Sequence, residues 1–441
     1  MVLPVFQKPV RMEVGGVPGL EGLLPLLRLE RHEFAAVLGQ PVEVAGPSDA
    51  EDHTWRVVID PHVHVPQLQA ETQRKSLTSV VPGPDHFGDT LNLLHTLAHS
   101  PNEAATFQET ETYGQAAERI DCEVANTYPS FELRGLDWEE ISARYAGIGR
   151  LAAEDFWRQA RRWVAALGDA HTAVIPPGAR QHPPYVAEMT ATGARLLKVP
   201  ESSAAYGAGV RAGWTIQVEQ PAEWLAVTGA SQQHRTIVAA RRYMEMTTTP
   251  RRFTARGPTG EQTSWDEAVS APGPSVIRSG PSIRIHRFDG HTPALLAEAL
   301  RLSTQHPEIT VDLRGNIGGS LEAADLCRRM LIPEAGSFGS IRYSDGRGGL
   351  SPSYALQLEP VDVGFRGRVR ALVDAITYSA AEDFLQPLVG LDHVHVEGGP
   401  TGGGSGRART VPLKDGYRLR VSTAITYTRD GQPIEYLGLG G

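Results

Sequence analysis

A serine at the start of a predicted helix is the first residue whose type and position could do chemistry. Ser379 follows the apolar run 371–375, which predicts a buried strand, and it precedes a helical pattern that begins at residue 380. Free backbone N–H groups and the positive end of a helix dipole surround such a position, so the hydroxyl could act as a nucleophile. The spacing of Ser379 and Glu382 also fits a helix capping box, so a purely structural serine is the alternative.

A glycine-rich loop, DLRGNIGGS at residues 312–320, follows a second predicted strand at 309–313. Glycines let a backbone approach a ligand closely and point N–H groups at negative charge. The loop could therefore stabilise an oxyanion. A phosphate cradle is the competing use, but the sequence lacks the lysine and the spacing of a P-loop.

A histidine and a carboxylate occur in distant parts of the chain. His171 lies just after a predicted helix in GDAHT (168–172), and Glu435 follows a turn in DGQPIE (430–435). Near neutral pH a histidine can take the proton of a serine hydroxyl and return it to a leaving group. Taken singly, however, each has an ordinary interpretation, as a structural histidine and as a solvated surface glutamate.

The elements that must position the histidine are helical. Apolar residues three and four positions apart predict helices at 138–145 and 156–164, with Asp137 capping the first and Gly168 following the second. We therefore expect a small helical unit over residues 116–185.

A different pattern follows over residues 186–272. A strand is predicted at 193–199, a short helix at 202–210 and a strand at 212–216, with further strands after residue 250. This order resembles a PDZ domain, a module that binds peptides by adding a strand to its own sheet. An unrelated small β domain is the alternative.

Strands and helices alternate from residue 273 to residue 441, which predicts crossover connections and a largely parallel sheet. The strands are expected at 282–288, 309–313 and 369–375, and the helices at 293–303, at 321–331 and from 379 onward. Functional groups should gather at the carboxyl ends of these strands. The expected fold class is multidomain α/β, and residues 1–115 show no clear periodicity and are assigned no role.

Four motifs occur in a fixed order behind the PDZ-like segment. They are the glycine-rich loop, TYSAAEDF (377–384), the glycine segment GGPTGGG (398–404) and the DGQPIE turn. Together they resemble the serine peptidases of the tricorn-core and C-terminal-processing (tail-specific) family, over about residues 125–441. The resemblance implies a crotonase-like αββ core and an enzyme that cleaves peptides or proteins through an acyl-enzyme, without a cofactor.

The resemblance also implies roles for individual residues. GDAHT looks like the DxH motif of the histidine-using branch, in which a histidine of the helical unit is the base and a glutamate near the C-terminus supports it. This implies Ser379 as nucleophile, His171 as base and Glu435 as support, with the N–H groups of Gly318 and Ala380 forming the oxyanion hole. Protonation of His171 should then lower activity on the acid side.

The sequence favours this branch over the family's lysine-using branch. The lysine of that branch would fall within the three glycines 402–404, and Lys414 is the only lysine after the serine. Two departures from the family pattern concern the support for the histidine and the chain end. Ala170 stands where the tricorn core has a serine, so Glu435 must reach His171 directly or through water. The chain also stops at Gly441, short of a segment that the family normally has, because the end has diverged or a tail is missing.

Two other functions remain open at this stage. His62 and His64 follow a predicted strand as HxH, the pattern by which amidohydrolases supply two metal ligands, but the chain lacks the eight strand-helix units of that barrel. An inactive relative that only binds peptides or hydrophobic ligands is the second alternative. Labelling by a covalent serine-directed probe would distinguish an enzyme from such a binder.

Length, charge and cysteine content limit the number of domains and the classes of partner that this chain could have. The 441 residues allow several domains, and 42 basic against 51 acidic residues give a net charge of −9 at pH 7, which argues against nucleic acid as the partner. The 2 cysteines, Cys122 and Cys327, suit neither a disulfide framework nor a zinc site. No apolar stretch is long enough to span a membrane. We expect a cytoplasmic protein, although an exported protein without its leader would look the same, and the sequence does not predict an oligomeric state.

Overall fold

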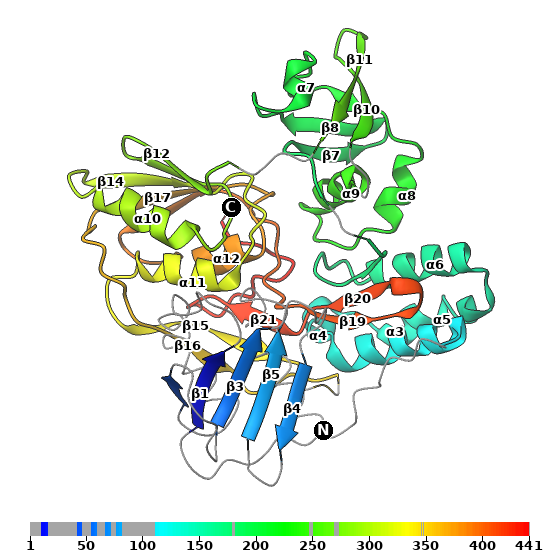
Figure 1. Cartoon of the computed structure of the whole chain (residues 1–441), viewed down its shortest axis with the longest axis horizontal. Helices are drawn as coiled ribbons and strands as arrows, with labels where there is room; N and C mark the ends of the chain where they lie inside the picture. Colours follow the sequence, from blue (N-terminus) through cyan, green and yellow to red (C-terminus); the bar gives the residue numbers. More distant parts are fainter. Residues whose placement is uncertain are drawn as a thin grey trace.

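The computed structural model describes residues 111–440, apart from 179–180, 247–249, 269–272, 345 and 347, together with five strands near the N-terminus. Those strands form one sheet of order β2-β1-β3-β5-β4, in which only β4 runs antiparallel to its neighbour (Figure 1). Their bounds are β1 (Val10–Gly15), β2 (Val42–Ala45), β3 (Thr54–Ile59), β4 (Gln67–Glu71) and β5 (Ser76–Val81). The buried Val10, Trp55 and Val57 mark the core of this sheet.

The predicted helical unit is present, and both helices expected from periodicity are confirmed. Its elements are α3 (Tyr113–Thr127), α4 (Phe131–Arg134), α5 (Trp138–Ala143), η3 (Ile148–Arg150) and α6 (Ala153–Ala165). Asp137 caps α5, because its side chain accepts a hydrogen bond of 3.0 Å from the N–H of Glu140. Gly168 follows α6 with a φ of +62°, a conformation that favours glycine.

A strand from the helical unit pairs with a hairpin from near the end of the chain. The sheet has the order β19-β20-β6, with bounds β6 (Ala173–Ile175), β19 (Arg409–Pro412) and β20 (Arg418–Val421); the turn η5 (Lys414–Gly416) joins the last two. Leu413, Leu419 and Val421 of this hairpin are buried in the core of the helical unit. Figure 1 shows the hairpin beside the helices, although the two segments are far apart in sequence. Burial of this apolar surface fixes the segment just before β6, which contains His171.

Residues 186–267 form an antiparallel sheet of order β11-β10-β9-β8-β7 with three short helices. Its elements are β7 (Val186–Thr190), β8 (Gly193–Lys198), α7 (Ala204–Gly207), β9 (Thr215–Ile216), α8 (Pro221–Ala226), α9 (Arg235–Met244), β10 (Arg251–Arg256) and β11 (Gln262–Glu267). The predicted strand at 193–199 and the strands after 250 are confirmed. The helix expected at 202–210 is shorter. The resemblance of this sheet to a PDZ domain stays a prediction.

The C-terminal part contains the largely parallel sheet that alternation predicts, with the order β12-β13-β14-β17-β18. Only β12 is antiparallel to its neighbour. The strands are β12 (Val276–Ser279), β13 (Ser282–Ile285), β14 (Glu308–Asp312), β17 (Arg368–Val373) and β18 (Val394–Gly398). The helices are α10 (Thr292–Arg301), α11 (Leu321–Arg329), α12 (Ala380–Leu385) and the single turn η4 (Gln386–Leu388).

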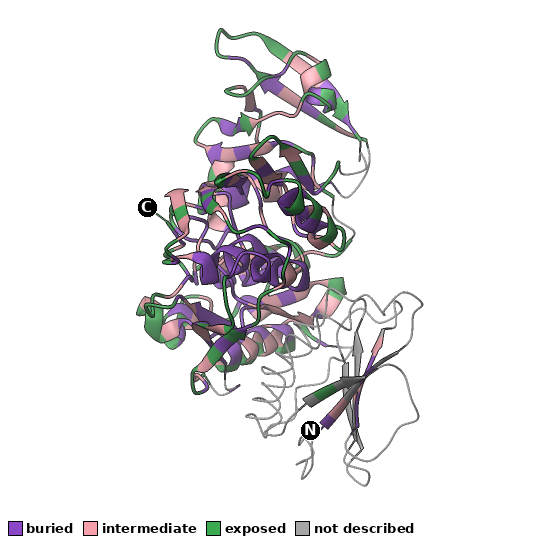
Figure 2. Ribbon diagram, turned by 90° about the vertical axis from the view of Figure 1, so that its left-hand side faces the viewer, coloured by how far each residue is buried: buried purple, intermediate pink, exposed green. Residues whose placement is uncertain are grey.

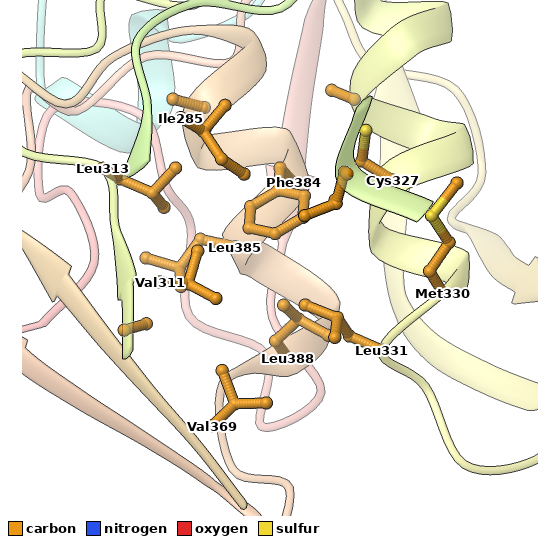
Figure 3. Packing of buried hydrophobic residues seen from close by; sticks show 14 of the residues in the cluster. Ile285, Val311, Leu313, Cys327, Met330, Leu331, Val369, Phe384, Leu385 and Leu388 are labelled. Atoms are coloured by element: carbon orange, nitrogen blue, oxygen red, sulfur yellow. The ribbon is translucent and has the colours of Figure 1, made fainter. Parts of the chain in front are cut away.

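The largest apolar core lies between this sheet and its helices. Figure 3 shows Phe384 and Leu385 of α12 packed among Val311 of β14 and Cys327 of α11. A further sheet of order β16-β15-β21 lies next to it, with bounds β15 (Gly336–Tyr343), β16 (Tyr354–Leu358) and β21 (Ala424–Tyr427). Buried residues are concentrated on the central helices and strands (Figure 2). No helix in the described part of the chain is both long enough and apolar enough to cross a bilayer.

A buried ion cluster joins α11 to the serine-bearing helix α12. Asp325 accepts a hydrogen bond of 2.8 Å from Nε of Arg328 and also bonds Arg329, and all three side chains are buried. Arg328 in turn donates to the carbonyl of Asp383 in α12 at 3.1 Å. Burial raises the pKa of Asp325, but the two guanidinium groups outweigh it and hold the pKa below its usual value.

We expect Asp325→Asn to lower the free energy of unfolding by about 3–5 kcal/mol, because it leaves two buried guanidinium groups without their carboxylate. Chemical denaturation measures this change. The matched control is Asp362→Asn, which removes an exposed pair with Arg366 (73% and 69% exposed side chains) and should change the free energy of unfolding far less, because solvent screens such a pair. Equal effects of the two substitutions would contradict the role given to the buried cluster.

Candidate active site

Ser379 lies in the turn between β17 and α12, as the strand-to-helix pattern predicts. Its backbone has φ +59° and ψ −126°, a conformation that an L residue rarely adopts and that costs about 1–3 kcal/mol. The N–H of Ser379 donates to Oε2 of Glu382 at 3.1 Å, so the carboxylate side of the predicted capping box is present. The strained turn points the hydroxyl away from the core, and the residue is half-buried.

Glu382 is the buried group that holds this turn. Besides Ser379, its carboxyl group accepts hydrogen bonds from the N–H groups of Gly403 and Gly404, at 2.8 Å and 2.9 Å, and from the hydroxyl of Thr401. Burial raises the pKa of Glu382 to about 8, although each of these hydrogen bonds opposes the rise. The serine turn and the glycine segment are thus joined through one side chain.

His171 reaches the serine from the helical unit. Its Nε2 lies 3.0 Å from Oγ of Ser379, a hydrogen-bond distance between residues 208 positions apart. Asp169 positions this histidine, because its Oδ1 accepts from the N–H of His171 at 2.8 Å. Oδ2 of Asp169 accepts from the hydroxyls of Thr172 and of Ser422, at 2.8 Å and 2.6 Å. Ser422 follows β20, so the C-terminal hairpin also holds the histidine segment.

Tyr378 is the residue that sequence reasoning missed. Its Oη lies 2.8 Å from Nδ1 of His171, on the side of the imidazole opposite the serine. The Tyr378 ring stacks between two imidazoles, with centroid distances of 4.7 Å to His171 and 4.4 Å to His234. His234 is held by a 2.7 Å contact from its Nδ1 to the carbonyl of Ala375. A tyrosine next to the serine was visible in the sequence, but no spacing rule links it to a histidine far away.

Glu435 does not contact the histidine. Its Oε1 accepts from the N–H of Ser405 at 3.2 Å and its Oε2 from the N–H of Thr426 at 3.1 Å. Both ring nitrogens of His171 are occupied by Ser379 and Tyr378. Burial raises the pKa of Glu435 well above its usual value, which favours the uncharged acid. The expected direct support of His171 by Glu435 is therefore wrong in geometry, because this carboxyl group instead fixes the backbone around it.

The structure shows why this fold has no room for a lysine within glycines 402–404, where the lysine-using branch would have one. A Cβ atom added to Gly404 would lie 2.5 Å from Oη of Tyr378, and one added to Gly402 would lie 2.5 Å from the Tyr378 ring. A side chain at either position would therefore occupy the space that the Tyr378 side chain fills. Lys414 is remote from the serine, above the ring of Tyr113 and 3.9 Å from Asp415. Lys8 and Lys75 lie outside the described residues.

The glycine-rich loop lies directly against the serine. A Cβ atom on Gly318 would meet the backbone N of Ala380 at 2.8 Å and Cβ of Ser379 at 2.9 Å. The N–H of Gly318, however, donates to Oδ1 of Asn316 at 2.8 Å. The N–H groups of Ala380 and Gly319 have no hydrogen-bond acceptor among the described residues. Of the predicted oxyanion donors, Ala380 is available and Gly318 is engaged.

These groups open into one pocket of about 480 Å³. Ser379, His171 and Gly319 line it, together with residues of α9 and of the sheet that contains β6 and β20. The pocket therefore lies where the helical unit, the β7–β11 sheet and the C-terminal α/β part meet. A pocket beside a nucleophile, a base and backbone N–H groups is the arrangement that acyl transfer requires.

Comparison with known proteins agrees with this chemistry. Residues 282–440 match the sequence model of a family described as peptidase family S41. The chain carries a peptidase family S41 domain. It is a serine-type peptidase, and the predicted family resemblance is confirmed. No curated protein sequence matches the chain.

Solved structures of low sequence identity share the fold of this chain. The photosystem II D1 C-terminal processing protease is 18% identical, and the match covers 75% of this chain and 92% of that one, with a TM-score of 0.51. Mature CPAF is 14% identical, with 74% and 92% covered and a TM-score of 0.55. CPAF complexed with lactacystin gives the same identity and coverage and a TM-score of 0.54. At these identities the likeness shows a common mixed α/β fold.

The metal-dependent alternative gains no support from the described part of the chain. Within those residues no group of three or more His, Cys, Asp or Glu side chains is placed to bind a metal ion. His62 and His64, the pair on which that alternative depended, lie outside the described residues. The alternative stays a prediction from sequence.

The environment of His171 predicts the acid limb of the pH profile. Burial lowers the pKa of His171 well below 6.5, and the positive charges of Arg420 and His234 lower it further. A base must be uncharged, so activity is retained as the pH falls past 6.5 and is lost only when the pH falls through the lowered pKa.

We therefore expect the acid limb of kcat/KM to have its midpoint below pH 6.5. Arg420→Gln removes one cause of the low pKa and should move this midpoint to higher pH, whereas Arg144→Gln, at the exposed residue that follows α5, should not. Initial rates of peptide hydrolysis from acid to neutral pH measure the midpoint. A midpoint at or above 6.5 in the unmodified protein would contradict the lowered pKa of His171, and a rate that stays constant over the whole acid range would contradict its assignment as the base.

Proposed function

We propose that this S41 peptidase hydrolyses peptide bonds through an acyl-enzyme formed on Oγ of Ser379, with His171 as the base. The observation that carries this proposal is the 3.0 Å distance between Nε2 of His171 and Oγ of Ser379 in a strained turn at the start of α12. Such turns expose a nucleophile beside unpaired N–H groups. The order of the groups along the chain is no obstacle, because geometry defines a catalytic set.

The first half of the reaction transfers the acyl group to the serine. Nε2 of His171 takes the hydroxyl proton while Oγ attacks the peptide carbonyl, and the resulting imidazolium gives that proton to the leaving amine. In the second half His171 takes a proton from the water that attacks the ester, and it returns this proton to Oγ of Ser379 as the ester bond breaks and the acid product leaves. No metal or cofactor takes part in these steps.

The tautomer of His171 decides whether this can happen. For Nε2 to accept a proton, Nδ1 must carry the hydrogen and donate it to Oη of Tyr378, 2.8 Å away. Burial raises the pKa of Tyr378 well above 10, so the phenol is neutral and orients the imidazole without a full negative charge. We therefore assign Tyr378 as the positioning residue of the base, the place that a carboxylate takes in Ser-His-acid triads.

The oxyanion is assigned to two backbone donors. Ala380 supplies the first N–H, at the start of α12 and next to the nucleophile. The glycine-rich loop supplies the second, from Gly319 or from Gly318 once its N–H leaves Asn316. Loss of one such donor costs about 3–4 kcal/mol of transition-state stabilisation in comparable enzymes.

The β7–β11 sheet is proposed as a PDZ-like module and the C-terminal α/β part as a crotonase-like core. The sequence order of strands and short helices supports the first, and the parallel sheet with α10–α12 supports the second. One neighbour in fold is named a C-terminal processing protease, which makes cleavage near a protein's C-terminus a reaction to test here.

Substitution of the two central residues tests the proposed chemistry. We expect Ser379→Ala to abolish labelling by an uncharged fluorophosphonate probe and, like His171→Ala, to lower kcat for peptides by about 10⁴-fold to 10⁶-fold. Ser337→Ala, at an exposed position of β15, is the matched control and should leave both measurements unchanged. Persistent labelling of the Ser379→Ala protein would rule out this serine as the nucleophile.

Tyr378→Phe and Glu435→Gln separate the two candidate supports of the base. Loss of the Tyr378 hydroxyl should lower kcat about 10-fold to 100-fold with little change in KM, because one buried hydrogen bond to the imidazole disappears. Glu435→Gln should mainly lower thermal stability. If Glu435→Gln instead lowers kcat as strongly as His171→Ala while Tyr378→Phe has no effect, the assignment of Tyr378 is wrong.

A further inference from the structure

The pocket in front of Ser379 has an unusual charge for a chain with a net charge of −9 at pH 7. Five of the residues that line it are arginines, and one, Glu245, is acidic. Arg161 and Arg242 are already engaged, the first over the ring of Trp224 and the second with the carbonyl of Val227 at 2.9 Å. The other three arginines, Arg241, Arg418 and Arg420, have no bonded acceptor among the described residues.

Two of these three arginines lie on strand β20, whose side chains point alternately into the helical core and toward the pocket. Arg418 and Arg420 lie two positions apart, so they share one face of the strand, while Leu419 between them is buried in the helical core. The register pairs Arg418 with Ile175 and Arg420 with Ala173, close to His171 in the chain. Both guanidinium groups line the pocket and make no hydrogen bond or ion pair with any described residue.

The third is Arg241 on helix α9, which lines the same pocket. Burial lowers the pKa of Arg241 to about 10, with partial compensation by the charge of Glu245. No described residue accepts a hydrogen bond from its guanidinium group. An arginine partly removed from water and without a bonded acceptor is costly unless an anion occupies the site.

We propose that these three arginines bind acidic side chains of the peptide substrate, so that the peptidase selects segments that contain Asp or Glu near the cleaved bond. The proposal rests on the proposed function, because it concerns the same pocket. Guanidinium groups bind carboxylates with paired, charge-assisted hydrogen bonds. Three of them, on two separate elements, exceed what one carboxylate can use, which favours an acidic segment over a single chain-terminal carboxylate.

Binding to the Ser379→Ala protein tests this without depending on catalysis. We would compare two pools of fluorescent, C-terminally amidated decapeptides that are identical except for Glu or Gln at two adjacent positions. Fluorescence anisotropy should show at least about tenfold tighter binding of the Glu pool, with the difference shrinking as salt is raised. Equal affinities of the two pools would overturn the proposal.

Arginine variants locate the effect. In the Ser379→Ala background, Arg418→Gln with Arg420→Gln should remove most of the preference for Glu, and Arg241→Gln part of it. Arg144→Gln, which changes an exposed arginine just after α5, is the matched control and should keep the preference. A preference that survives all three pocket substitutions overturns the proposal. Thermal midpoints close to that of the parent protein verify that the variants are folded.

A further arm separates the two sources of a carboxylate. The Gln pool is also made with a free C-terminus; if only this pool binds tightly, the arginines recognise a chain terminus and the acidic-segment proposal is overturned. Charge reversal gives a positive test, because Arg418→Glu should shift the preference from Glu toward Lys at the same positions. Fluorophosphonate labelling of the unmodified protein reports separately on the nucleophile, so failure of the substrate proposal and failure of the proposed function give different results.

Discussion

One buried carboxyl group, that of Glu382, holds the candidate active site together. It accepts hydrogen bonds from the serine turn on one side and from the glycine segment on the other. The positive φ of Ser379 is tolerated because these bonds fix the backbone on both sides of the strain. The glycine segment in turn lies against Tyr378, which orients the imidazole. The placement of the nucleophile and of the positioning residue therefore depends on the contacts of this one side chain.

Apolar packing brings the histidine to this turn. The strand after His171 pairs with β20, and the leucine and valine side chains of the β19–β20 hairpin are buried among the helices. The same alternation that buries Leu419 leaves Arg418 and Arg420 on the side of the pocket. One face of β20 thus stabilises the helical unit, and the other face supplies positive charge to the pocket. This explains how an acidic protein can present a basic pocket.

Much of this arrangement could be predicted from local patterns. Periodicity indicated the helices around 138–145 and 156–164, and alternation indicated the parallel sheet with Ser379 after its strand β17. Ser379 and His171, chosen from motifs, lie at hydrogen-bond distance. What could not be predicted depends on contacts between distant segments: the neighbour of Nδ1 is decided by side-chain packing across 207 positions, so Tyr378 rather than Glu435 occupies that place. The engagement of the Gly318 N–H by Asn316 likewise depends on a local turn that composition does not reveal.

The pairing of β6 with β20 also has a consequence for synthesis of the protein. A chain that is still growing on the ribosome folds from its beginning, at about 5–20 residues per second. Until Ser422 has been added and released from the exit tunnel, Asp169 lacks one of its hydroxyl donors and the histidine segment lacks its neighbouring strand. The proposed catalytic pair of His171 and Ser379 therefore gains these supports only after the β19–β20 hairpin has been synthesised.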